Sequence, residues 1–276
     1  MRSCFLAAPF LLALIPAVHA GPPFLTDDPE PVDFKHFEAY LFSTADATHF
    51  GEGYFVPAFE MNWGALPDTQ LHIVIPAATF APTAGPSAFG ISDIELGVKY
   101  RFIHETKHRP EFGVFPFLEA PTGSFAAGLG NGRAWYRLPL WVQKSEGPWT
   151  TYGGAGEQLN SAPGMTNFTF AGWLLQRDIG KKWTLGSEVY YHGAGGPAAL
   201  STRASTLLDA GGYYYIHKPG FQILFMGGHS VSGQAETVAY LGLYWTWGKG
   251  DKDALSSGFL HERAVPYETA AARSAR

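Results

Sequence analysis

The stretch Asp93-Ile94-Glu95-Leu96-Gly97-Val98-Lys99-Tyr100-Arg101-Phe102 decides the fold class of this chain. Its even-numbered residues are apolar or aromatic, and its odd-numbered residues are charged or glycine. Strict alternation puts the two sets on opposite faces of a β-strand, whereas a helix would mix them. The stretch therefore predicts a strand with one apolar face and one charged face.

The same period of two recurs along most of the chain. The predicted strands are residues 34–42, 53–63, 69–77, 90–102, 110–120, 133–144, 149–160, 167–177, 183–193, 205–217, 221–230 and 236–247. Short, turn-like connections alternate with mostly longer ones such as residues 43–52, 78–89 and 121–132. This layout is typical of an up-and-down barrel with tight turns at one rim and open loops at the other. No strand is followed by a helical pattern, so an α/β fold is excluded.

The composition agrees with a β protein. Of 276 residues, only 16% are charged, against about 25% in soluble domains. The 21 Phe, 13 Tyr and 8 Trp exclude a disordered chain, and the 33 Gly and 20 Pro would interrupt long helices. Nucleic-acid-binding domains are usually basic, whereas this chain has a net charge of -5, so no nucleic-acid partner is expected.

The N-terminus predicts export. A short positive start is followed by an apolar stretch that ends in a small-x-small cleavage site, Val18-His19-Ala20. Residues 1–20 are therefore interpreted as a cleaved signal peptide, with a retained membrane anchor as the alternative. The predicted location is the bacterial outer membrane. Cleavage removes Cys4, the single cysteine, so no disulfide framework is expected.

The charged face separates a membrane barrel from a soluble sandwich. In a sandwich the mid-strand charges would face water, but in a membrane barrel they face the lumen, because a charge at the lipid midplane costs about 2–4 kcal/mol. Aromatic residues near strand ends favour the membrane, since such rings form interfacial girdles: Trp63, Phe102, Trp149, Trp183, Tyr244, Trp245 and Trp247. The predicted lumen-lining residues are Glu38, Glu60, Asp93, Glu95, Lys99, Arg101, Glu111, Glu119, Arg133, Arg137, Glu157, Arg177, Glu188 and Asp209.

These patterns predict an all-β chain with a transmembrane antiparallel up-and-down β-barrel of about 12 strands over residues 34–247, surrounded by outer-membrane lipids. Residues 21–33 are an extended, proline-rich segment. Residues 22–32 would fold into the lumen as a plug, or else form a disordered periplasmic leader. Residues 248–276 are predicted to form a charged periplasmic tail.

Several stretches resemble the outer-membrane family named after the MetA pathway of phenol degradation. They are Pro-Phe-Leu-Thr-Asp-Asp-Pro-Glu-Pro at 23–31, the block at 90–102, and residues 119–123, 128–132 and 147–154. The block from Asp93 to Phe102 is the most specific of them. Members are described as outer-membrane transporters, so the resemblance implies a barrel and transport. It supplies no binding residues.

Catalytic and metal-binding patterns are weak. The cluster His229-Ser230-Val231-Ser232-Gly233 has a histidine and serines near a strand end, as in outer-membrane phospholipase A, but its spacing differs. His104 and His108 lie in a turn, and the glycine-rich residues 122–132 do not open a helix. No catalytic, cofactor-binding or metal-binding residue is predicted, and no cofactor.

The predicted function is therefore passive passage of a small, aromatic or otherwise hydrophobic solute. Twelve strands give a backbone radius of roughly 12 Å and a lumen about 8–10 Å wide. A ladder of charges is expected across it, with Lys99, Arg101, Arg133 and Arg137 facing Glu95, Glu111 and Glu119. The alternatives are a barrel-borne lipid hydrolase and an exported soluble β binding protein. The solute and the oligomeric state do not follow from the sequence.

Overall fold

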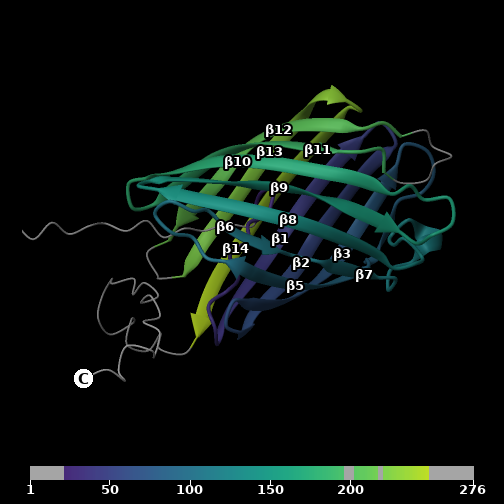
Figure 1. Cartoon of the computed structure of the whole chain (residues 1–276). Coiled ribbons are helices and arrows are strands. Elements are labelled where there is room, and N and C mark those ends of the chain that lie inside the picture. The colour runs from purple at the N-terminus through teal and green to yellow at the C-terminus, as the bar shows by residue number, and fades with distance from the viewer. Residues whose placement is uncertain (1–21, 196–201, 217–219, 249–276) are drawn as a thin grey trace, which may run out of the picture.

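The computed structural model describes residues 22–195, 202–216 and 220–248. The predicted signal peptide and the predicted tail beyond Gly248 lie outside these residues. Within them, one antiparallel sheet closes on itself, because β1 (His36–Thr48) pairs with both β2 (Gly51–Leu66) and β14 (Glu236–Gly248). Figure 1 shows the strands tilted around a single wall. No helix in the described part of the chain is long and apolar enough to span a membrane.

The wall has twelve strand positions, as the alternation predicts. Two positions are interrupted. β4 (Ala88–Ile91) and β5 (Ile94–Ile103) share one, because both pair with β3 (Thr69–Pro82). β6 (Glu111–Val114) and β7 (Phe117–Ala120) share the next, between β5 and β8. The other strands are β8 (Trp135–Glu146), β9 (Trp149–Asn160), β10 (Phe168–Ile179), β11 (Trp183–His192), β12 (Ser205–Tyr215) and β13 (Phe221–Gly233).

The break between β6 and β7 lies at Phe115-Pro116. Proline has no backbone N–H to give to the ladder, so a strand interruption is expected there. The neighbouring strand still reaches this point, because the Val98 N–H donates to the Pro116 carbonyl over 3.1 Å. Phe115 turns inward and is buried.

The predicted long loop at residues 43–52 is wrong. β1 and β2 continue as a long hairpin and meet at a tight turn formed by His49 and Phe50. Residues 43–48 are Ser, Thr, Ala and Asp, so they offer little contrast between an apolar and a polar face. The backbone pairs nevertheless, because closing the wall satisfies its N–H and C=O groups.

Large apolar side chains cover the outer face of the wall. Leu96, Val98, Tyr100 and Phe102 of the deciding stretch are all exposed there, and their charged neighbours point inward. Further exposed outer residues are Leu41, Phe59, Leu71, Ile75, Leu138, Leu140, Trp173, Leu175, Leu185, Val189, Leu208, Leu241 and Leu243. A monomeric soluble protein does not expose such a continuous apolar belt.

Aromatic rings gather at the rim with the short turns. Phe37 stacks between Trp63, at 6.0 Å, and Trp247, at 5.5 Å between ring centroids. One predicted girdle residue is misplaced: Tyr244 is buried inside the barrel, where its hydroxyl donates to Glu38 over 2.8 Å. Its register explains this, because Trp245 and Trp247 lie on the opposite face of β14 from Tyr244.

Candidate functional site

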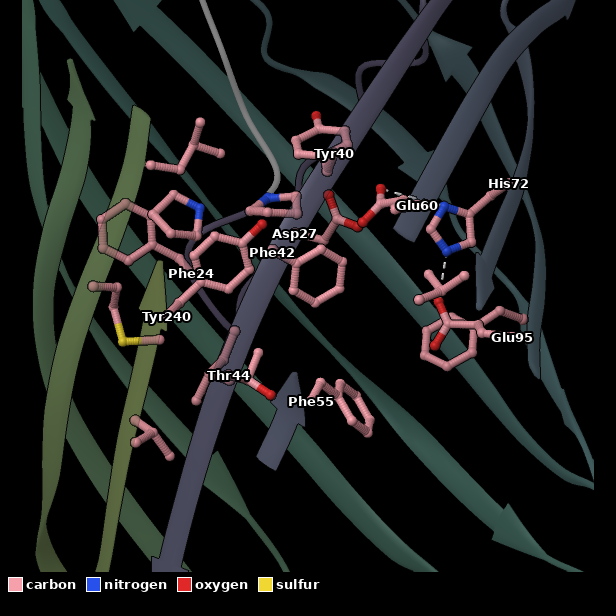
Figure 2. A pocket seen from close by; sticks show the side chains of 18 of the residues that line it. Phe24, Asp27, Tyr40, Phe42, Thr44, Phe55, Glu60, His72, Glu95 and Tyr240 are labelled. Atoms are coloured by element: carbon pink, nitrogen blue, oxygen red, sulfur yellow. Dashed lines mark hydrogen bonds and ion pairs between the residues drawn. The ribbon is translucent and has the colours of Figure 1, made fainter. Parts of the chain in front are cut away.

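The barrel interior contains a cavity of about 820 Å³. Aromatic side chains from strands all around the wall line it, and Figure 2 shows Tyr40, Phe42, Phe55 and Tyr240 around a shared space. Phe42 and Tyr240 stack at 5.2 Å. The other aromatic lining residues among those described are Phe24, Tyr54, Phe80, Phe115, Phe117, Trp141, Phe168, Phe170, Tyr190, Tyr213 and Tyr244. The volume lies within the range of small-molecule sites, about 300–1,000 Å³.

Glycines of β9 make room for two of these rings. A Cβ at Gly154 would come 2.7 Å from Trp141, and a Cβ at Gly156 would come 2.7 Å from Phe170. Both distances are too short for real contacts, so only glycine lets the rings lie against the wall. The glycine-rich sequence at 153–156 therefore shapes the aromatic surface of the cavity.

Residues 22–33 lie inside the barrel, where several of them also line this cavity. The Val32 N–H donates to Gln70 over 2.9 Å near the short-turn rim. Deeper inside, the Glu188 carboxylate accepts the N–H groups of Leu25 and Thr26 over 2.9 and 2.8 Å. The segment therefore runs from the rim toward the middle of the barrel and is held by backbone hydrogen bonds at both places.

Charge also holds this segment. Lys99 Nζ lies 2.9 Å from Asp27 and 3.5 Å from Asp28, and Arg101 lies 3.7 Å from Glu30. Burial raises the pKa of the Asp28 carboxyl well above its usual value, and the charge of Lys99 opposes that rise. Asp28 is fully buried, and Lys99 is the cation that lies against its carboxyl group.

A polar cluster faces the segment from β2, β3 and β5. His72 is buried, with Nδ1 2.6 Å from the Asn62 side-chain oxygen and Nε2 2.7 Å from Glu95. The Glu60 carboxylate lies 3.5 Å from the same ring (Figure 2). It also accepts a hydrogen bond from the Asn62 side-chain amide over 2.9 Å. The cluster adds a hydrogen-bonding wall to the cavity beside its aromatic rings.

Arg137 points into the cavity from β8 with different partners. Its guanidinium lies 4.2 Å from the Phe170 ring centroid and 5.8 Å from that of Phe117. Nη2 donates to the Tyr190 hydroxyl over 2.6 Å, while the buried Nε has no hydrogen-bond partner among the described residues.

The connection between β7 and β8 closes over the far end of the cavity. Its residue Leu129 is buried and lines both this cavity and a second one of about 500 Å³ at the loop rim. The buried carboxylate of Asp93 holds the connection, because it accepts the N–H groups of Gly123 over 2.9 Å and Asn131 over 2.7 Å.

Replacing Asp93 with alanine is expected to release this connection. Hydrogen bonds to a charged group contribute about 1.5–3 kcal/mol, so local opening should increase about tenfold or more. The measurement is the rate of tryptic cleavage after Arg133, which is exposed in the same connection. Glu157→Ala, at an exposed position on β9, is the control and should leave the rate unchanged. Equal cleavage in the Asp93 variant and the wild type would contradict this role.

The structure brings together many of the predicted lumen residues. Ten have inward-facing side chains in the wall: Glu38, Glu60, Glu95, Lys99, Arg101, Glu111, Glu119, Arg137, Glu188 and Asp209. The expected ladder is different in detail. Arg101 pairs with Glu111 over 3.2 Å, but it also pairs with Asp68 over 2.9 Å in the turn between β2 and β3. Lys99 pairs with the N-terminal segment, and Asp93 lies between β4 and β5 rather than within a strand.

Three predicted lumen residues lie elsewhere. Arg133 is exposed in the connection before β8, because that strand begins only at Trp135. Glu157 is on the outer face, where it accepts from Thr169 over 2.6 Å near the loop rim. Arg177 is also outside, over the Trp149 ring at 5.0 Å near the short-turn rim. At the rims, water and headgroups solvate a charge, so the outer face tolerates it.

Sequence reasoning missed His72, Gln70 and Trp141 as interior residues. All three lie at positions of the same parity as inward residues on their strands, and Trp141 shares its face with Arg137. The alternation of inward and outward positions along each strand would have identified them if it had been applied to uncharged residues as well.

The histidine and the first serine of the 229–233 cluster have separate partners. His229 faces outward and lies 2.7 Å from the Thr237 hydroxyl, whereas the Ser230 hydroxyl accepts the Glu236 N–H over 3.0 Å. Among the described residues, no group of three or more His, Cys, Asp or Glu side chains is arranged to hold a metal ion.

Solved structures give the clearest comparison. An outer-membrane channel from Pseudomonas putida F1 matches with a TM-score of 0.65 at 14% identity, over 80% of this chain and 98% of that one. The chain has the fold of an outer-membrane β-barrel. The KdgM porin also matches, with a TM-score of 0.51 at 9% identity over 75% of this chain and 99% of that one. The translocator domain of the autotransporter NalP from Neisseria meningitidis gives 0.51 at 10%, over 76% and 87%.

Sequence comparisons do not name a family. No family model matches the chain, and no curated protein matches it. The resemblance to the family named after the MetA pathway therefore stays a prediction. At these low identities, the solved structures establish the barrel and leave the solute open.

Proposed function

We propose that this protein is an outer-membrane channel for the passive passage of small aromatic or hydrophobic solutes. The observation that carries the proposal is the cavity of about 820 Å³ inside a closed barrel, where aromatic side chains from around the wall lie between charged and polar groups. Aromatic rings bind other planar rings through offset-stacked and edge-to-face contacts.

The exposed apolar belt supports the membrane location. Its residues are mid-strand, where a lipid-facing barrel needs apolar side chains, and the aromatic girdle lies at the short-turn rim. Two of the structural neighbours are an outer-membrane channel and a porin, which also favours a channel over an enzyme. Outer-membrane lipids and a small solute are then the expected partners.

The N-terminal segment is proposed to be a plug. Residues 22–32 occupy the half of the barrel near the short-turn rim, and they are held by Gln70, Glu188 and Lys99. A segment fixed at several depths narrows the path for any solute or ion. Transport then requires the segment to shift or leave.

Single-channel recording tests this proposal. The mature protein, folded in detergent and inserted into a planar bilayer, is expected to give discrete openings of low conductance, since the segment narrows the path. A preparation that is folded by circular dichroism but silent, both intact and after removal of residues 22–32, would contradict a channel.

A further inference from the structure

Arg137 differs from the other two cations that reach the interior from the described strands. Lys99 and Arg101 are both paired with carboxylates, whereas none of the ion pairs among the described residues includes Arg137. Its protein contacts are the Tyr190 hydroxyl and the faces of Phe117 and Phe170. The buried Nε–H donor is left without an acceptor.

Such an arrangement has a free-energy cost. A half-buried guanidinium that lies outside any ion pair is only partly stabilised by cation–π contacts and by one hydrogen bond to a neutral hydroxyl. A second buried donor of the same aromatic wall, Trp141 Nε1, also has no partner among the described residues. The Trp141 ring lies 6.1 Å from Phe170, which is the ring beneath Arg137. Among the described residues, this part of the cavity therefore presents a cation outside any ion pair and two buried N–H donors without an acceptor.

The surroundings limit what an incoming group can be. Trp141, Phe170, Phe117 and Tyr190 all line the cavity together with Arg137, so the group enters between ring faces and edges. Glu119 on β7 interacts electrostatically with Arg137 without forming an ion pair with it. The Glu119 carboxylate repels any anion placed beside Arg137, and it repels a dianion more strongly than a monoanion.

We infer that Arg137 and the surrounding aromatic rings form a binding site for a small aromatic monocarboxylate. The carboxylate accepts hydrogen bonds from Nε and the neighbouring Nη of Arg137, and the ring of the solute packs on Trp141 and Phe170. This inference rests on the proposed function and deepens it by naming the chemical class of solute.

Calorimetry on the full mature protein in detergent tests the site, with benzoate and its neutral analogue benzamide as probes. Benzoate is expected to bind about tenfold or more tightly than benzamide, because a hydrogen bond to a charged group contributes about 1.5–3 kcal/mol. Arg137→Gln should weaken benzoate binding about tenfold or more and leave benzamide binding nearly unchanged. Arg137→Lys keeps the charge but loses the paired geometry, so it should be intermediate.

Arg177→Gln is the matched control, because it removes an arginine that also lies over an aromatic ring but faces outward. It should bind benzoate like the wild type. Heat-modifiable migration on gels checks that each variant is folded. If Arg137→Gln does not fold, the binding of benzoate to Arg137→Lys is compared with that of the wild type instead. Equal binding of benzoate and benzamide by the wild type, or an equal loss in the Arg137 and Arg177 variants, would overturn the site.

The site and the channel can fail separately. Benzoate binding to a protein that carries no current, both intact and without residues 22–32, would refute the channel and leave the site intact. Ion current from a protein that binds benzoate no more tightly than benzamide would refute the site and leave the channel intact.

Discussion

Replacing Leu140 with arginine is expected to destabilise the folded protein by about 2–4 kcal/mol in a lipid bilayer. Leu140 lies in the middle of β8 on the outer face, with 50% of its surface exposed. In a membrane barrel that surface contacts hydrocarbon, so an arginine there loses its hydration. Urea unfolding in phosphatidylcholine vesicles, followed by tryptophan fluorescence, measures the change in the free energy of unfolding.

Leu66→Arg makes the same chemical change at the end of β2 and serves as the control. Leu66 is 61% exposed and lies at the short-turn rim, where an arginine costs only about 0–1 kcal/mol. In a water-soluble barrel both exposed sites would tolerate arginine within about 0.5 kcal/mol. Small and equal effects at the two positions would therefore contradict the membrane interpretation.

Deleting residues 22–32 is expected to raise single-channel conductance several-fold. The deletion removes the segment that the Glu188 carboxylate and Lys99 hold within the lumen. It also leaves Lys99 without the acidic partners Asp27 and Asp28, so thermal stability should fall as conductance rises. Conductance in planar bilayers at fixed salt measures the first effect, and thermal melting measures the second.

A point substitution on β10 should have a smaller effect in the same direction. A Cβ at Gly172 would come 1.8 Å from the Thr26 hydroxyl oxygen, so Gly172→Ala displaces the segment without shortening the chain. Ala171→Val adds bulk to the neighbouring position on the opposite face of β10 and is the control. A deletion variant that conducts no better than the intact protein would show that the segment does not limit passage.

The alternation of residue types predicts the wall of the barrel well. In β5 the contrast between apolar and charged positions is strong, so both the strand and its faces follow from the sequence. The hairpin of β1 and β2 is different, because the small and polar residues near its turn hide the period. The backbone of this hairpin is paired because the wall closes into a barrel. Closure depends on the whole sheet, so it cannot be predicted from a local stretch of sequence.

The interior is harder to predict because its contacts join residues far apart in the chain. Lys99 meets Asp27, and Glu188 meets Thr26, only because the N-terminal segment returns into the lumen. The alternation along each strand predicts which residues face inward, but it does not predict how deep in the barrel each residue lies. Glu157 and Arg177 illustrate the same limit, because a charge faces outward at a rim and inward at the midplane.

Osmotic swelling of proteoliposomes tests most directly the proposal that the lumen carries small aromatic solutes. Phenyl glucoside and maltose are both neutral and do not cross lipid unaided, and they differ in whether a phenyl ring or a second sugar is attached to glucose. Proteoliposomes containing the variant that lacks residues 22–32 are expected to swell several-fold faster in phenyl glucoside than in maltose. Equal rates, or faster swelling in maltose, would contradict the claim.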